Sequence, residues 1–437
     1  MAALHDLSGL AGALLATSLL VAAPSAAVVA AQASPPAEMA GPVHSDPVLT
    51  LDEALAVARG EQPGVAAFER DAIASEQAAI AARSLPDPEV SVGIQNFPIR
   101  GDNAFSPTDD EMTMYTIGVM REQVRRSRRE AEASRLQAEA VVSRAEGTAR
   151  QRKIQRDVMI AWLGAVEAAA RQRLLAQVVS DLQTGLKVIE AGVPTGASSP
   201  ALALEAQAEV ALAEAQASAA RGDEVRARAE LGRWIGPAAQ RPLPDRVPSL
   251  ALPSQASEAS AFATHPEILA ARAKEEAAER QTDVARAERR PSVSWSAMIG
   301  FRPRYGEMVS AQVSIPLQIN RRGLQNRRIA EAQARADAAR LRTLDAAREL
   351  GGTYGAALAD YRKADAQIAL LRDKAIPSLD ASFKAAEARY AGGQGTLELP
   401  LNIVRRYVEA NVQLVEQQGA RARAAAELLY LTGEQPR

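Results

Sequence analysis

The chain has 437 residues, with 51 Lys and Arg against 53 Asp and Glu, so its formal net charge is −2. A chain this close to neutrality lacks the basic excess of a nucleic-acid-binding protein. It contains no Cys and only three His, which excludes disulfides, thiolate metal centres, Cys nucleophiles and His-rich metal sites.

The first 33 residues have the pattern of a secretory signal peptide. Residues 10–23 form an apolar run that is too short to span a bilayer, and Ala31 and Ala33 frame an A-x-A cleavage pattern. No Lys or Arg precedes the run, so a buried N-terminal helix is the alternative. Residues 34–48 are rich in Pro, Ala and Ser and are expected to form a flexible lead-in. An exported chain of this kind is periplasmic, extracellular, or inserted in an outer membrane through β-strands.

The rest of the chain repeats itself once. Proline and glycine punctuation recurs at two fixed offsets, 203 residues early in each half and 197 residues later on. The matched positions are Pro63 with Pro266, Pro88 with Pro291, Gly196 with Gly393, and Gly236 with Gly433. The pattern predicts two structural repeats, 49–236 and 253–434, joined by a linker at 237–252. The first repeat carries six extra residues, which we place in a loop.

Each repeat is predicted to start with a helix, at 51–84 and 258–289. Thr50 and Glu53 form a capping box at the start of the first helix. A β-hairpin follows, at 89–120 and 292–318. In these segments apolar residues such as Val90 and Val293 alternate with small polar ones, as in a tilted transmembrane β-strand. The alternation leaves open which face of the strand containing Met112 and Met120 meets lipid.

Long helices are predicted next, at 127–190 and 327–390. Some 64 residues of helix extend about 95 Å, which suits coiled coils and helical barrels rather than a globular core. Pro377 lies inside the second helix and is expected to kink it or open it locally. Each long helix ends at a Gly-rich break and returns as a shorter helix, at 200–234 and 397–431.

The predicted strands require several chains. Four strands cannot close a barrel, and an open sheet edge in lipid leaves unpaired backbone groups that cost several kcal/mol each. Two copies would give 8 strands and a barrel filled by side chains, whereas three copies would give 12 strands and room for a channel. Because the polar faces carry small side chains, the sequence favours a homotrimer with an open pore.

The order of elements and several short motifs resemble the TolC-type outer-membrane efflux factors, over residues 49–434. The motifs are LTLDEAL at 49–55, LPDP at 85–88, Ile376-Pro377, Ala388-Arg389-Tyr390, and Leu428 to Gly433. The resemblance implies a mainly α fold with a small transmembrane β part, in which a trimeric 12-stranded β-barrel is continued by an α-helical periplasmic barrel. It also implies a passive channel in the bacterial outer membrane that meets a periplasmic adaptor protein and, through it, an inner-membrane efflux pump.

The functional residues that we predict lie mostly at the periplasmic tip. Gly196 and Gly393 fit turns that need positive φ. Leu202 and Leu399 are candidate adaptor-docking residues, unless they only pack within the tip. The gate candidates are Arg389 and Tyr390, which could instead cap the helix C-terminus. Basic residues after the strands suit a membrane interface or a solvated charge run; they are Arg125, Arg126, Arg128, Arg129, Arg321 and Arg322.

The sequence is least informative about cargo. Met112, Met114 and Met120 carry thioethers, which soft cations such as copper and silver favour, although such residues also pack against lipid. Residues 110–120 resemble efflux factors that work with heavy-metal pumps, so heavy-metal cations are the leading prediction. Drug or organic-molecule efflux and type I secretion are alternatives with the same fold, and a periplasmic coiled-coil scaffold or adaptor is the alternative of another class. We expect no catalytic residue, cofactor or resident metal.

Overall fold

The structure is a computed structural model that describes residues 47–60, 62–196, 198–252, 262–391 and 398–434. All of them belong to one unit, Asp46–Arg437. The predicted signal peptide at 1–33, nearly all of the lead-in at 34–48, and Gly393 lie outside the described residues. None of the described helices is both long and apolar enough to span a membrane.

The first predicted helix is two helices, so the single helix expected at 51–84 is wrong. α1 (Leu51–Ala58) opens with the predicted capping box, in which Thr50 Oγ1 accepts a hydrogen bond from the Glu53 amide at 3.3 Å and the Glu53 carboxylate accepts one from the Thr50 amide at 3.2 Å. α2 (Pro63–Ala82) begins again with Pro63 in its first turn. Proline lacks the N–H that a continuous helix would use there, and its ring clashes with the preceding turn, so the chain breaks before it.

The four strands form one antiparallel sheet in the order β1-β2-β3-β4. The strands are β1 (Glu89–Gln95), β2 (Met114–Gln123), β3 (Val293–Arg302) and β4 (Tyr305–Ser314). The two hairpins therefore join through the β2–β3 pair, which links the two repeats. The connection at 96–113 is much longer than the turn at 303–304, which places the surplus of the first repeat in its hairpin, offset in part by a longer segment at 315–324.

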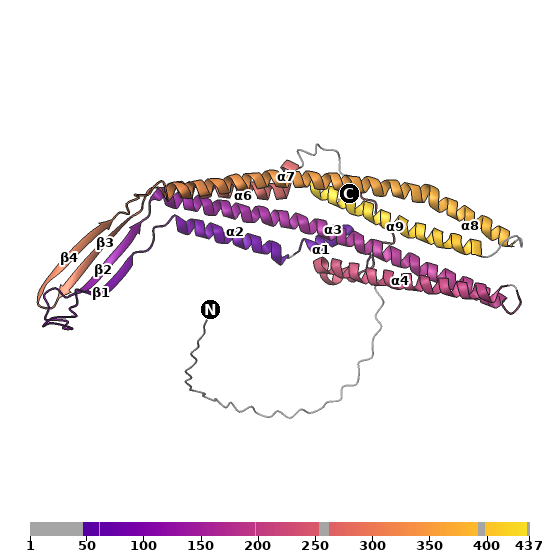
Figure 1. The fold of residues 1–437 in the computed structure, drawn as a ribbon, viewed down its shortest axis with the longest axis horizontal. Helices are drawn as coiled ribbons and strands as arrows, with labels where there is room; N and C mark the ends of the chain where they lie inside the picture. Colours follow the sequence, from indigo (N-terminus) through magenta and orange to yellow (C-terminus); the bar gives the residue numbers. More distant parts are fainter. Residues whose placement is uncertain (1–46, 61, 197, 253–261, 392–397, 435–437) are drawn as a thin grey trace, which may run out of the picture. The chain divides into compact units, whose positions relative to one another are not determined.

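The helices begin where the sheet ends (Figure 1). α3 (Arg126–Gly192) has 67 residues and packs against α1, α2, α4 (Pro200–Ile235), α6 (Pro266–Ala287) and α9 (Glu398–Thr432). α7 (Gln325–Leu370) packs against α6 and α9, and α8 (Ile376–Ala391) packs against α9. The fold is therefore mainly α, with a strand hairpin and a long helical hairpin in each repeat, as predicted.

Pro377 disturbs the second long helix, as predicted. Between α7 and α8 the chain passes through a π-helical turn, η2 (Leu371–Ala375), immediately before the helix that contains Pro377. A proline cannot donate to the carbonyl four residues earlier, and a wider π turn is one of the ways in which a helix accommodates that loss. The helix is thus opened locally rather than ended.

The main core lies where both repeats meet α3. It joins Trp162 and Val166 of α3 to Leu49, to Leu231 of α4 and to Leu429 of α9, all of them buried. The Trp162 indole N–H donates to the Leu49 carbonyl at 3.2 Å, and the Leu49 amide donates to the Pro242 carbonyl at 2.8 Å. The segment after the 3-10 turn η1 (Gly236–Gln240) therefore packs along the body, with Leu243 and Leu250 in the same core.

A second, smaller core surrounds His265 at the start of α6. The ring is buried, its Nδ1 accepts a hydrogen bond from the Glu267 amide at 3.3 Å, and Tyr430 contacts it edge-on at 5.0 Å between centroids. The Tyr430 hydroxyl donates to the Glu267 carboxylate at 2.7 Å. Burial lowers the pKa of His265, and Arg152 acts in the same direction, whereas the Glu267 carboxylate opposes them.

This arrangement predicts that acidification destabilises the fold through His265. Above its ordinary pKa of 6.5 the ring is neutral in the folded and unfolded states and contributes nothing to the pH dependence. Below that pH the unfolded chain takes up a proton that the folded chain resists, so the free energy of unfolding falls. Chemical denaturation at pH 7 and pH 5 should show a larger loss for the natural protein than for His265→Asn, which keeps a capping acceptor. Equal losses would contradict the prediction.

Candidate functional site

One face of the sheet carries an apolar band that crosses all four strands, with Arg121 and Gln123 at its helix end. Cross-strand partners share a face in an antiparallel sheet, so the register assigns each residue to a side. The central row of this face is Val92, Ile117, Ile299 and Val309. The flanking rows add Val90, Val119, Ala297 and Ala311 on one side and Ile94, Tyr115 and Phe301 on the other. Val92 is 80% exposed and Val309 77% exposed, so this face lacks a cover among the described residues.

The opposite face carries small and polar side chains together with methionines. Its rows include Ser91, Gly118, Met298 and Ser310, then Gly93, Thr116, Gly300 and Met308. Met114 and Met120 belong to this face as well, through their partners Gln95, Glu89 and Ser296. The register thus answers the question that the alternation left open: on β2 the methionines share the polar face, and Tyr115, Ile117 and Val119 share the apolar one.

The sheet has two unpaired edges among the described residues. β1 pairs only with β2, and β4 pairs only with β3. Both edge strands are exposed along their whole length. An open edge presents a row of free N–H and C=O groups, which another strand can pair with.

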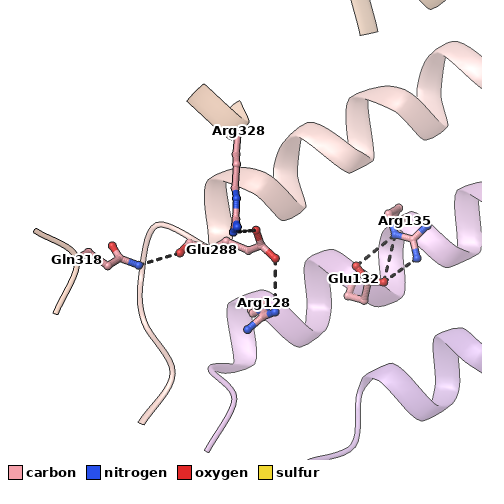
Figure 2. Close-up of polar contacts among 6 residues, drawn as sticks. All are labelled: Arg128, Glu132, Arg135, Glu288, Gln318 and Arg328. Atoms are coloured by element: carbon pink, nitrogen blue, oxygen red, sulfur yellow. Dashed lines mark hydrogen bonds and ion pairs between the residues drawn. The ribbon is translucent and has the colours of Figure 1, made fainter. Parts of the chain in front are cut away.

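A polar cluster joins the sheet to the helices (Figure 2). Glu288, just after α6, lies between Arg128 of α3 and Arg328 of α7, at 3.4 Å and 3.8 Å from their guanidinium nitrogens. The Glu288 backbone carbonyl also accepts a hydrogen bond at 3.1 Å from Nε2 of Gln318, which lies in the segment before α7. One residue therefore ties the starts of both long helices to the end of a third.

Other arginines near this junction bind backbone carbonyls. Arg121 donates to the Pro86 carbonyl at 3.0 Å, Arg125 donates to the Pro291 carbonyl at 2.9 Å, and Arg129 donates to the Arg83 carbonyl. Arg83 is the C-cap of α2, whose last carbonyls lack helical partners, whereas Pro86 and Pro291 lie in the segments that lead from α2 and α6 into the sheet. Much of the predicted basic run is therefore structural, while Arg126 is exposed and pairs with Glu130 within α3.

The turn between α3 and α4 is tight and ordered by hydrogen bonds. Gly196 has φ of 72°, as predicted, and the Thr195 hydroxyl donates to the Gly192 carbonyl at 3.0 Å. Ser199 caps α4 by accepting a hydrogen bond from the Leu202 amide at 3.2 Å. Leu202 is half-buried on the first turn of α4, close to the glycine turn in sequence. Gly196 and Leu202 are thus brought into one compact turn.

The turn between α8 and α9 is described only in part. Arg389 is exposed in the last turn of α8, and Leu399 lies in the first turn of α9. Gly393 and the side chains of Tyr390 and Leu399 lie outside the described part of the chain. In Figure 1 the helix pairs α3–α4 and α8–α9 both extend away from the sheet. The two pairs contact each other through Arg405 of α9, which lies 3.8 Å from Glu209 of α4.

We expect Gly196→Ala to loosen the first tip. A side chain at φ of 72° costs about 1–2 kcal/mol in the left-handed region. Hydrogen exchange at the amides of Ser198 and Leu202, which are bonded in this turn, should accelerate several-fold. Gly185→Ala is the matched control, because Gly185 lies within α3 with nothing within 4 Å of an added Cβ, so it should leave the turn unchanged. Unchanged exchange in Gly196→Ala would contradict the role given to the turn.

The comparisons with known proteins agree with this architecture. The family model described as outer membrane efflux protein matches residues 259–434. The resemblance to the TolC-type outer-membrane efflux factors is confirmed. No curated protein matches the chain.

Several solved structures, among them outer membrane proteins and channels, match almost the whole described unit. The outer membrane protein VceC of Vibrio cholerae aligns with a TM-score of 0.71 and 18% identity, covering 88% of this chain and 96% of that one. CusC, described in connection with transmembrane channel formation, aligns at 0.74 and 17% identity over 88% and 92%. The Campylobacter jejuni CmeC outer membrane channel aligns at 0.73 and 13% identity over 88% and 85%. These likenesses show that the TolC-like fold extends over both repeats.

Part of the site was missed from the sequence. Met308 was assigned to no face, and the arginine contacts to carbonyls were not foreseen. Met298 alternates in step with Ser294 and Ser296, and this spacing was the sequence signal that placed it on the polar face. No group of three or more His, Asp or Glu residues able to hold a metal ion occurs in the described parts of the chain.

Proposed function

We propose that three copies of this chain form an outer-membrane channel of a tripartite efflux system. The observation that carries the proposal is the sheet: one face has three adjoining apolar rows, the other is polar, and both edges are unpaired among the described residues. An apolar face and a polar face on one sheet suit a wall with lipid on one side and water on the other. The exposed rows around Val92 and Val309 would meet hydrocarbon.

Closure of the wall follows from the strand order. β1 and β4 point in opposite directions, because the sheet has four antiparallel strands. The β4 edge of one copy can therefore pair with the β1 edge of the next, and every pair in the ring is antiparallel. Three copies give twelve strands, wide enough for a channel, and satisfy the backbone groups that lipid cannot.

The helical part of the proposed trimer would continue the channel into the periplasm. α4 and α7 expose large aliphatic side chains that no described residue covers, and they suit contacts between copies. These are Leu204, Leu212 and Val225 on α4, and Leu341, Leu344 and Leu370 on α7. The tips would meet a periplasmic adaptor through Gly196, Leu202, Gly393 and Leu399, with Arg389 and Tyr390 at the gate. The energy would come from an inner-membrane pump, and the channel would conduct passively, without chemistry of its own.

For cargo we propose heavy-metal cations. Four methionines lie on the face that would line the lumen, and thioethers are ligands for soft cations. Methionines on a lipid-facing surface would indicate only packing against lipid. A channel for organic molecules would use the same wall, so cargo is tested separately from channel formation.

Three measurements test the proposal. Native mass spectrometry of the detergent-purified protein should give a trimer, and the protein should fractionate with outer membranes. A deletion strain should then become sensitive to silver and copper salts while keeping its resistance to lipophilic drugs. A detergent-independent monomer or dimer would contradict the channel, and drug sensitivity alone would replace the cargo but keep the channel.

A further inference from the structure

We propose that Met114, Met298 and Met308 form a binding site for a soft monovalent cation, Cu⁺ or Ag⁺, on the polar face of the sheet. The position of this site inside a conduit depends on the proposed function, whereas cation binding does not. The three residues come from β2, β3 and β4 and meet around one glycine.

Gly300 is the centre of the arrangement. Met308 is its direct cross-strand partner, and Met298 precedes it by two residues on the same strand and the same face. Met114 lies on the other side, on β2, and its Sδ is only 3.0 Å from where a Cβ on Gly300 would stand. The glycine is buried although it has no side chain, so neighbouring side chains cover it. The three methionines thus occupy neighbouring positions on the same face around one backbone position, and the sulfur of Met114 lies directly against it.

The floor beneath the sulfurs consists of small residues. Gly93 and Thr116 share the row of Gly300, and Gly118 and Ser91 lie in the next row. Thr116 is 7% exposed, because longer side chains lie over it. Small side chains here leave the long methionines room to move across the surface, and methionine, with three rotatable bonds, is suited to such adjustment.

The sulfur of Met298 is accessible to polar groups. Gln95 Nε2, on β1, donates a hydrogen bond to Met298 Sδ at 3.4 Å. This hydrogen bond shows that the sulfur of the half-buried Met298 faces a polar group rather than an apolar core. The lone pairs of this sulfur are the ones that bind a metal.

The chemistry selects the class of ion. Thioethers are neutral, soft donors that favour Cu⁺ and bind Mg²⁺, Ca²⁺ or Mn²⁺ poorly. The apolar face of the same strands uses Val, Ile, Phe and Trp instead, so methionine is concentrated on the polar side. A site of neutral ligands with only partial burial holds its ion weakly, which suits a passing cargo.

Binding can be measured directly on the purified full-length protein in detergent. Equilibrium dialysis against AgNO₃ in chloride-free buffer, followed by metal analysis, should give saturable Ag⁺ binding. The double substitution Met114→Leu with Met298→Leu keeps volume and apolarity but removes two thioethers, and it should weaken binding at least tenfold. Met112→Leu is the matched control, because Met112 is 62% exposed outside the strands, and it should bind within twofold of the natural protein.

A second variant tests the geometry with all methionines in place. Gly300→Ala would put a methyl group 3.0 Å from Met114 Sδ, so the thioether must move away. We expect weaker Ag⁺ binding at unchanged methionine content. Unchanged binding in the double variant, or no saturable binding by the natural protein, would overturn the proposal.

Conductance separates this proposal from the channel itself. Each variant is reconstituted in planar bilayers alongside the dialysis. Normal conductance without Ag⁺ binding leaves the channel standing and removes the site. Ag⁺ binding by a protein that neither trimerises nor conducts keeps the site and removes the channel.

Discussion

Arginine at both Val92 and Val309 should keep the protein out of the outer membrane. The two residues lie in one transverse row of the apolar face, on the two edge strands, and are 80% and 77% exposed. An arginine on the lipid side of a barrel costs about 2–4 kcal/mol near the bilayer midplane, so the pair should oppose insertion strongly. The folding stability of the single chain should change little, because neither valine side chain is packed against other residues. We expect the variant to vanish from the outer-membrane fraction and to lose the trimer band.

The adjacent row provides a control of the same size and charge. Ser91 and Ser310 lie on the same two edge strands but on the polar face. Arginines there would point toward water, so the Ser91→Arg, Ser310→Arg protein should insert and trimerise, although it changes conductance. If this control were lost while the valine variant inserted, the two faces would be assigned the wrong way round. Insertion of both would indicate that the sheet does not enter lipid.

The two faces were predictable on each strand but not between strands. Alternation gave the parity of Val90 and Val293 directly, because side chains on a strand change sides at every residue. For β2, with methionines on one parity and Tyr115, Ile117 and Val119 on the other, parity alone was indecisive. Its assignment needed the pairing with β1 and β3, and the long connection at 96–113 does not fix that register. A shift of one residue would have moved all the methionines to the other side.

Contacts at the junction between sheet and helices, and at the helical tips, were not predictable from the sequence. Glu288, Arg128 and Arg328 are far apart in sequence and meet only because three helix ends converge at the sheet. The positions of the prolines predicted the helix opening before Pro377 and the end of α2, because a proline disturbs only the helical turn next to it. The split between α1 and α2 was missed although Gly60 and Pro63 mark it in the sequence. For the second tip, Gly393, Tyr390 and Leu399 stay predictions.

The core around Trp162 should be the most sensitive point of the helical body. Its side chain is 2% exposed and its indole N–H binds the Leu49 carbonyl, so Trp162→Ala both opens a cavity and leaves that carbonyl without its donor. Large aromatic truncations in a core cost about 3–5 kcal/mol. An unsatisfied buried acceptor adds about 1–3 kcal/mol.

The expected result is a protein that loses about 3 kcal/mol or more in its free energy of unfolding, measured by chemical denaturation in detergent. Trp162→Phe keeps the ring but removes the donor and should cost less than Trp162→Ala. Trp234→Ala is the external control, because that ring is only half-buried against Arg233, at 4.8 Å, and should cost less again. The local consequence separates packing from a general loss: Leu49 is tied both to Trp162 and to the Pro242 carbonyl. Proteolysis within 47–62 should therefore appear first in Trp162→Ala, and equal protection in all three variants would show that α1 is held by other contacts.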